Sequence, residues 1–218
     1  MDTFVFILEI IGTVAFSVSG AMTGIKKRMD ILGVVILGLV TAVGGGIIRD
    51  LVLGITPPTT FRKSVYAAVA VFTAIVIFFP FVRRLLSHTH HLYDAVLFFM
   101  DSLGLAIFTV MGIFSANEMA VRHSTFLLLF VGVITGVGGG VMRDILAGNT
   151  PYIFVKHIYA CASLVGAAVC VALWHTAIGS LWAMVIGAVI VFVIRVLAAH
   201  FKWNLPRAVD FEAKGENK

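Results

Sequence analysis

Nearly the whole chain is made of apolar stretches that are each about as long as a lipid bilayer is thick. Crossing the hydrocarbon core takes roughly 20 apolar residues in a helix. Little sequence is left between the stretches, so no soluble domain fits into the chain. The sequence therefore predicts an all-α integral membrane protein with seven transmembrane helices. They are expected at about residues 4–25, 31–54, 64–82, 93–117, 123–148, 155–174 and 177–201.

The charged side chains agree with this prediction. Of the 218 residues, 60% are hydrophobic and only 12% are charged, which is far from the composition of a soluble domain. A net charge of +5 would suggest nucleic acid as the partner of a soluble protein. Here the positive side chains stand in short loops beside the spans, where they set the orientation of a membrane protein. We expect membrane lipid as a partner and no nucleic acid.

These positive side chains divide unequally between the two sides of the membrane. The side with more of them is expected to be cytoplasmic. That places the N-terminus outside and the C-terminus inside, which agrees with an odd number of spans. The larger set is Lys26, Lys27, Arg28, Arg83, Arg84, Lys156, Lys202 and Arg207, and the smaller set is Arg62, Lys63 and Arg122.

The sequence indicates neither an enzyme nor a site for a metal or cofactor. It has no nucleophile with a nearby base, no phosphate-binding loop after a strand and no zinc-ligand spacing. Cys161 and Cys170 lie within one apolar stretch and are expected to be small core residues. The segment HTHH, from His88 to His91, lies beside Arg83 and Arg84, so we interpret it as a solvated loop rather than a metal site.

One motif occurs twice within the apolar stretches. TAVGGGIIRDLVLGITP covers residues 41–57, and TGVGGGVMRDILAGNTP covers residues 135–151. The repeat extends further, because EIIGTVAFSVSG at 9–20 matches DSLGLAIFTVMG at 101–112 in its acid, glycines, phenylalanine and hydroxyl residue. FRKSVYA from Phe61 also matches FVKHIYA from Phe154, with phenylalanine, lysine, tyrosine and alanine at the same positions.

The repeat predicts three plus three plus one spans. We expect a first three-helix unit at 1–92, a second at 93–174, a last helix at 175–201 and a cytoplasmic tail at 202–218. Because each unit contains an odd number of crossings, the second must enter the membrane from the opposite side. An inverted repeat of this kind places a permeation or binding site near the midplane, where interrupted helices of the two halves meet.

The glycines predict where such interruptions lie. Each glycine in a helix is about 1 kcal/mol less favourable than alanine, so three in a row are expected to kink or unwind the second and fifth helices. Freed carbonyls persist in a membrane only inside protein or beside a water-filled cavity. With hydroxyls one turn earlier, they would replace part of the hydration shell of a cation. The residues concerned are Gly44, Gly45, Gly46, Gly138, Gly139 and Gly140, with Thr41 and Thr135.

A second interpretation of the glycines stays open. Closely spaced glycines in a membrane helix most often form a surface for tight helix packing. Kinking and packing are compatible with one another.

Ionisable residues inside a membrane usually pair within the bundle and mark a pathway. Asp50 and Asp144 would start the second half of each interrupted helix, where an acid is favoured. Arg49 and Arg143 are expected to reach Glu9 and Asp101 on other spans rather than the adjacent aspartates, and to gate or structure two vestibules. An alternative role for the two acids is to hold the bundle together. Phe16 and Phe108, at equivalent repeat positions, are a candidate apolar constriction.

With GGGxxRD in both the second and the fifth span of a three-plus-three-plus-one repeat, the chain resembles the bacterial members of the trimeric intracellular cation channel family. The resemblance covers about residues 4–201. It implies a homotrimer with one pore in each subunit, permeation of monovalent cations with potassium foremost and sodium as a further candidate, and a pore lined by the glycine-kinked second and fifth helices. It also implies a bacterial plasma membrane location.

The same resemblance leaves a rival function. Some bacterial relatives look like transporters of small solutes, with glycine as the proposed substrate. Amides at half-helix N-termini would suit a carboxylate, and carbonyls would suit an ammonium group or a coupling ion. The sequence does not separate the two functions.

Overall fold

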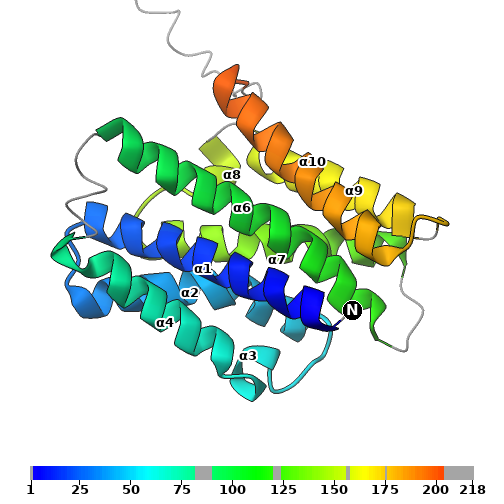
Figure 1. The fold of residues 1–218 in the computed structure, drawn as a ribbon, viewed down its shortest axis with the longest axis horizontal. Coiled ribbons are helices and arrows are strands. Elements are labelled where there is room, and N and C mark those ends of the chain that lie inside the picture. The colour runs from blue at the N-terminus through cyan, green and yellow to red at the C-terminus, as the bar shows by residue number, and fades with distance from the viewer. Residues whose placement is uncertain (1, 82–89, 120–123, 156–157, 175, 204–218) are drawn as a thin grey trace, which may run out of the picture.

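A computed structural model describes residues 2–81, 90–119, 124–155, 158–174 and 176–203, and within these ranges every regular element is a helix. The long helices run roughly along one direction and form a single bundle (Figure 1). Of the predicted HTHH loop, His88 and Thr89 lie outside the described residues, as does the tail from residue 204. The helices are α1 (Asp2–Lys26), α2 (Ile31–Val52), α3 (Thr59–Arg62), α4 (Val65–Phe78), α6 (His90–Asn117), α7 (Thr125–Leu146), α8 (Tyr152–Val155), α9 (Tyr159–Trp174) and α10 (Ser180–His200).

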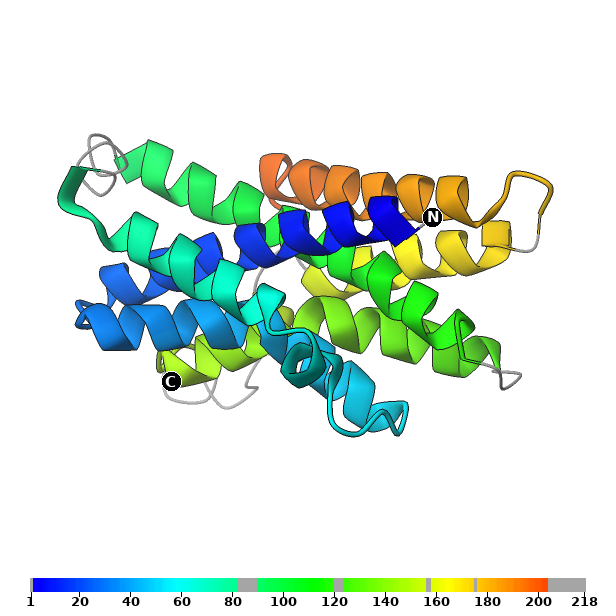
Figure 2. The same ribbon diagram turned by 60° about the horizontal axis from the view of Figure 1, so that its bottom comes forward.

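The order of the helices follows the predicted repeat. A long helix, a second long helix, a four-residue helix and a shorter apolar helix occur first as α1, α2, α3 and α4, and then as α6, α7, α8 and α9. In Figure 2, α4 lies across the α1–α2 pair, and α9 and α10 lie together on the other half of the bundle. The last helix, α10, has no counterpart in the first half.

Five of the described helices, namely α1, α2, α6, α7 and α10, are long and apolar enough to cross a membrane. Helices α4 and α9 are apolar as well, but they have 14 and 16 residues, which corresponds to about 21 and 24 Å at 1.5 Å per residue. A bilayer core is about 30 Å thick. The prediction of an all-helical membrane protein is confirmed, five spans are established, and crossing by α4 and α9 stays a prediction.

Equivalent signals begin and end α2 and α7. The carboxylate of Asp30 accepts a hydrogen bond from the Gly33 amide at 2.7 Å, and the hydroxyl of Ser124 accepts one from the Leu127 amide at 3.2 Å. Both are side-chain N-caps. After the last turns, Gly54 and Gly148 have φ values of 73° and 65°, which glycine adopts at little cost and which end a helix.

The glycine triplets do not interrupt these two helices. Residues Ile31–Val52 form one continuous helix, and so do residues Thr125–Leu146. The expected unwinding is therefore wrong, and so is the expectation that Asp50 and Asp144 start a second half-helix. Both acids lie in the last turns of uninterrupted helices. A bend of the helix axis within a continuous helix stays a prediction.

Close packing explains why glycines occupy these positions. A Cβ atom built on Gly45 would lie 2.1 Å from the carbonyl oxygen of Thr135, and one built on Gly139 would lie 2.1 Å from the carbonyl oxygen of Thr41. The backbones of α2 and α7 thus touch at the centre of the bundle, in a reciprocal contact that any side chain would prevent. Of the two interpretations of the glycines, the packing surface is the one that the structure contains.

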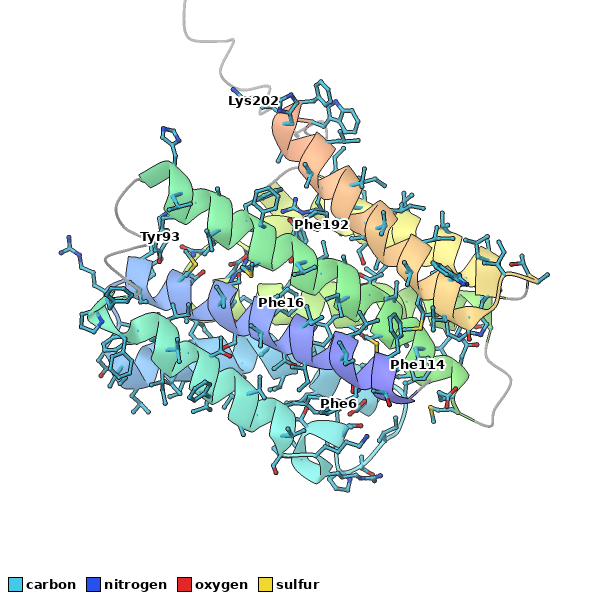
Figure 3. The ribbon with its side chains drawn as sticks, in the orientation of Figure 1. Phe6, Phe16, Tyr93, Phe114, Phe192 and Lys202 are labelled. Carbon is cyan, nitrogen blue, oxygen red and sulfur yellow. The ribbon has the colours of Figure 1, made fainter. Side chains whose placement is uncertain are left out.

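The remaining surfaces of the helices divide into core and periphery. Phe16 lies in the middle of the bundle, and it is 1% exposed (Figure 3). Large apolar side chains on the outside of the described helices include Phe72, Phe126 and Trp182, which are more than half exposed. Such a surface suits the hydrocarbon of a membrane, where apolar side chains need no further cover.

Candidate functional site

Two arginine–aspartate pairs mark the ends of α2 and α7. The Nε atom of Arg49 donates to Oδ1 of Asp50 at 2.8 Å, and that of Arg143 donates to Oδ1 of Asp144 at 2.9 Å. The prediction of partners on other spans rather than the adjacent aspartates is therefore wrong for Arg49 and incomplete for Arg143. All four side chains are buried, and a buried ion without a partner costs several kcal/mol, which favours the nearest counter-ion.

Each aspartate also holds the chain that follows its helix. The second carboxylate oxygen of Asp50 accepts a hydrogen bond from the Thr59 amide at 2.6 Å, and that of Asp144 accepts one from the Tyr152 amide at 2.9 Å. These amides begin α3 and α8, so the two acids connect each long helix to the short helix after it. An acid near the C-terminus of a helix opposes the helix dipole, and the arginine and the amide compensate for this.

In the second half, Arg143 reaches a further acid. Its Nη1 atom lies 2.5 Å from Oδ1 of Asp101, and it also donates to the hydroxyl of Ser19. The Tyr159 hydroxyl donates to the same carboxylate oxygen at 3.4 Å. Arg143 and Asp101 were predicted as partners, and the structure brings them together. We call Asp101, Arg143, Asp144 and Arg195 the Asp101 cluster.

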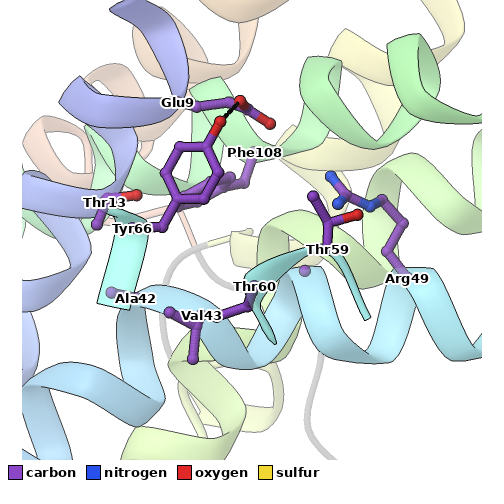
Figure 4. Close-up of a pocket in the computed structure, with 10 residues that line it drawn as sticks. Glu9, Thr13, Ala42, Val43, Arg49, Thr59, Thr60, Tyr66 and Phe108 are labelled. Atoms are coloured by element: carbon purple, nitrogen blue, oxygen red, sulfur yellow. Dashed lines mark hydrogen bonds between the residues drawn. The ribbon is translucent and has the colours of Figure 1, made fainter. Parts of the chain in front are cut away.

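In the first half, the equivalent acid is arranged differently. Glu9 accepts a hydrogen bond from the hydroxyl of Tyr66, which is the repeat counterpart of Tyr159. Among the described residues, no ion pair joins Glu9 to Arg49, although both side chains line the same cavity (Figure 4). The predicted partnership of Arg49 with Glu9 is therefore not formed. The guanidinium and the carboxylate instead stand apart, with the cavity between them.

Two hollows open toward opposite ends of the bundle. One has a volume of about 340 Å³, is continuous in its lining with the cavity of Figure 4, and is called the Glu9 vestibule below. The other has a volume of about 490 Å³ and is called the Lys26 vestibule. Charged and polar residues lining the Glu9 vestibule are Glu9, Arg49, Asp50, Thr59, Lys63, Tyr66, Ser115 and Glu118. Those lining the Lys26 vestibule are Thr23, Lys26, Lys27, Asn149, Thr150 and Tyr152.

Packed side chains lie between the two vestibules. The rings of Phe16 and Phe108 are in contact, with centroids 5.3 Å apart. Phe108 lines the cavity of Figure 4, whereas Phe16 packs close to Gly104 and Gly139. The two phenylalanines that the sequence analysis singled out thus meet beside the α2–α7 crossing.

The two threonines before the glycines do not face a cavity. Thr41 and Thr135 are fully buried, and their hydroxyls donate to the carbonyls of Leu37 and Val131 in their own helices at 2.5 and 2.6 Å. Because the helices stay continuous, no carbonyls are freed beside them. Both hydroxyls are thus engaged within their own helices, and coordination of a cation by these groups stays a prediction.

The sequence analysis missed Arg195. This side chain lies on α10, is 2% exposed, and places its Nη2 atom 3.8 Å from Oδ2 of Asp101. Its guanidinium also stacks on Tyr159, 4.6 Å from the ring centroid. An arginine within an apolar span is a visible signal, since intramembrane charges are costly and usually functional. Arg195 lies on α10, outside the repeat, so no matched motif marks it.

The chain is similar to a protein family, to a bacterial membrane protein and to solved channel structures. A protein-family model described as "Glycine transporter" matches residues 6–81 and 98–175. The "UPF0126 inner membrane protein YadS" of Escherichia coli is 35% identical over 203 residues, covering 93% of this chain and 95% of its own. A chain solved in work on the structural basis for conductance through TRIC cation channels has a TM-score of 0.82 and 36% identity, with 93% and 96% covered. The TRIC trimeric intracellular cation channel orthologue from Rhodobacter sphaeroides has a TM-score of 0.82 and 33% identity, with 92% and 100% covered.

Proposed function

The chain belongs to the prokaryotic TRIC family of UPF0126 membrane proteins, and from this premise we propose that it is a monovalent cation channel that conducts potassium. One observation in the molecule supports the proposal most strongly. Two vestibules lie at opposite ends of the bundle, and the packed rings of Phe16 and Phe108 lie beside the α2–α7 crossing, where Phe108 lines the cavity that continues the Glu9 vestibule.

In this proposal, the described conformation is closed. Phe16 and Phe108 form the apolar constriction, and movement of their rings connects the vestibules. Gly44, Gly45, Gly138 and Gly139 let α2 and α7 approach closely enough to line one narrow pathway, Gly46 lines the cavity of Figure 4, and Gly140 lies against Tyr159. Arg49 and Arg143 control the two entrances, and Glu9 supplies negative charge that favours cations, whereas Asp101 is paired with Arg143.

Assembly and location are part of the proposal. Solved relatives are named trimeric channels, so we infer a homotrimer with one pathway in each subunit. YadS is named an inner membrane protein, and we infer a bacterial plasma membrane location for this chain as well, with the N-terminus outside. Native mass spectrometry of the detergent-solubilised protein tests the trimer directly, since it resolves one, two and three copies.

The function is tested electrically. Purified protein is placed in a planar bilayer under a potassium gradient, and the current is recorded before and after sodium replaces potassium on one side. Discrete unitary currents that reverse near the potassium equilibrium potential are the expected result. A carrier moves ions too slowly to produce single steps, because each turnover needs a conformational cycle on the microsecond to millisecond scale. Absence of unitary currents from correctly assembled protein would contradict the channel.

A second function is favoured by one observation and by the name of the family model. Glu9 and Arg49 line one cavity without pairing, with the hydroxyls of Thr59 and Tyr66 beside them. Such a site offers a carboxylate to an ammonium group and a guanidinium to a carboxylate, which suits a small zwitterion such as glycine. Saturable uptake of radiolabelled glycine into proteoliposomes, from protein that is electrically silent, would favour the transporter.

A further inference from the structure

The two halves of the repeat carry different amounts of charge, although their arginine–aspartate motifs are the same. The Glu9 vestibule is lined by three acids and two bases, which gives a formal charge of −1. The Asp101 cluster contains two acids and two bases, so its formal charge is zero. The charged side chains that line the Lys26 vestibule are two lysines. Charge therefore differs from one end of the pathway to the other.

Arg195 makes the Asp101 cluster neutral, because without it the cluster would carry a formal charge of −1. Glu9 and Asp101 occupy equivalent repeat positions, and so do Arg49 and Arg143. Arg195 lies on α10, which is outside the repeat, and no equivalent side chain faces Glu9 among the described residues. Its guanidinium is held between Asp101 and the rings of Tyr159 and Phe98, with centroid distances of 4.6 and 5.0 Å. A stacked, buried guanidinium of this kind is fixed in place.

The Asp101 cluster also borders the pathway. The guanidinium of Arg143 stacks on Tyr152 at 4.9 Å, and Tyr152 lines the Lys26 vestibule. A change in the charge of the cluster therefore changes the electrostatic potential in that vestibule, because only the ring of Tyr152 separates Arg143 from it. We propose that Arg195 makes the cation pathway rectifying: by neutralising Asp101 it leaves the Glu9 vestibule as the negatively charged entrance, from which cations enter more readily.

This inference rests on the proposed channel function and adds a residue and a direction to it. The expected size follows from electrostatics. A unit charge about 12 Å away, at an effective dielectric constant of about 40 that lies between those of a protein surface and of water, changes the local cation concentration about threefold. The effect must shrink in concentrated salt, because the Debye length falls to about 3 Å at 1 M. A purely structural contribution of Arg195 would not depend on salt in this way.

Excised patches from giant bacterial spheroplasts test the inference, because all channels in them keep the orientation set by the cell. The rectification ratio, which is the inward current at −100 mV divided by the outward current at +100 mV, is measured in symmetrical KCl at about 0.05 M and at about 1 M. Arg195→Met, which keeps the length of the side chain and removes its charge, is expected to lower the rectification ratio about threefold at low salt. The matched control Arg195→Lys keeps the charge and is expected to keep the ratio.

Glu9→Gln is a second variant that is expected to reduce the charge difference between the two ends of the pathway. It removes the negative charge of the Glu9 vestibule without touching Arg195, so the ratio is again expected to fall about threefold while the low-salt conductance decreases. In Arg195→Met, by contrast, the low-salt conductance is expected to increase. Opposite changes in conductance with the same change in rectification identify an electrostatic cause.

Each alternative outcome is distinct. Unitary currents in the wild-type protein with an unchanged ratio in Arg195→Met would overturn the inference and leave the channel intact. Loss of unitary currents in the wild-type protein itself would overturn the proposed function and this inference with it. If Arg195→Met does not assemble as a trimer, Glu9→Gln decides, and a ratio equal to that of the wild type refutes the inference.

Discussion

Gly45 and Gly46 are neighbours in α2, but their surroundings differ. A Cβ on Gly45 would lie 2.1 Å from the Thr135 carbonyl oxygen, whereas one on Gly46 would meet its nearest neighbour, a side-chain nitrogen of Arg49, at 3.9 Å. At Gly45 the neighbour is backbone, which cannot move aside without moving the helix. At Gly46 the distance is that of an ordinary van der Waals contact. The sequence alone treats the glycines of a triplet as equivalent, because the partner helix decides which of them are needed.

This difference gives a paired prediction. Gly45→Ala is expected to destabilise the protein by about 1–3 kcal/mol or more, since α2 and α7 must separate. Gly46→Ala is expected to be neutral or to stabilise it by about 0.5–1 kcal/mol, because alanine is the better helix former. Reversible unfolding in mixed SDS and detergent micelles measures both. Equal losses for the two variants would favour helix kinking over packing as the reason for the triplet.

The two membrane-embedded acids allow a second comparison at this scale. Asp101 is fully buried against Arg143 and near Arg195, whereas Glu9 is half-buried and lines an open cavity. Asp101→Asn leaves two buried guanidinium groups short of a counter-charge and is expected to cost about 3–5 kcal/mol. Glu9→Gln is expected to cost less than about 1 kcal/mol. The same unfolding measurement applies, and a larger loss for Glu9→Gln would contradict the difference in burial between the two acids.

At the scale of the helix, the sequence predicted the repeat well and the helix ends less well. The matched motifs indicated that α2 corresponds to α7 and α1 to α6, because a pattern of glycine, phenylalanine and acid survives in both copies. The continuity of α2 and α7 was not predictable, since helix propensity argues against three glycines and the energy of helix packing argues for them. The packing term depends on a partner that the local sequence does not contain.

The short helices α3 and α8 are held by single carboxylate oxygens, which makes them separately testable. Asp144→Asn weakens the acceptor of the Tyr152 amide, a hydrogen bond to a charged group worth about 1.5–3 kcal/mol. Hydrogen exchange measured by mass spectrometry is expected to accelerate in Tyr152–Val155. Exchange in Thr59–Arg62, which Asp50 holds in the other half, serves as the control within the same molecule. Equal acceleration in both segments would indicate global destabilisation instead.

At the scale of the whole molecule, charge in the loops predicts the orientation. Lys27 follows α1 at the end where the Lys26 vestibule opens, and Glu118 follows α6 at the end of the Glu9 vestibule. In a Cys161→Ala, Cys170→Ala background, a membrane-impermeant maleimide added to intact cells is expected to label Glu118→Cys and not Lys27→Cys. Both must react after permeabilisation. Labelling of Lys27→Cys in intact cells would show that the orientation is the opposite of the predicted one, and the expected direction of rectification would then be opposite as well.

The contact between α2 and α7 is reciprocal: Gly45 touches the residue that matches Thr41, and Gly139 touches Thr41 itself. Two separate copies of one protein make such an isologous contact across a two-fold axis, and every substitution then appears on both sides at once. Here one chain contains both sides. Each side is therefore free to change alone. Glu9 has diverged from Asp101, and α10 packs against α6 and α9 of the second half. An antiparallel pair of identical subunits could not have evolved a pathway with a preferred direction.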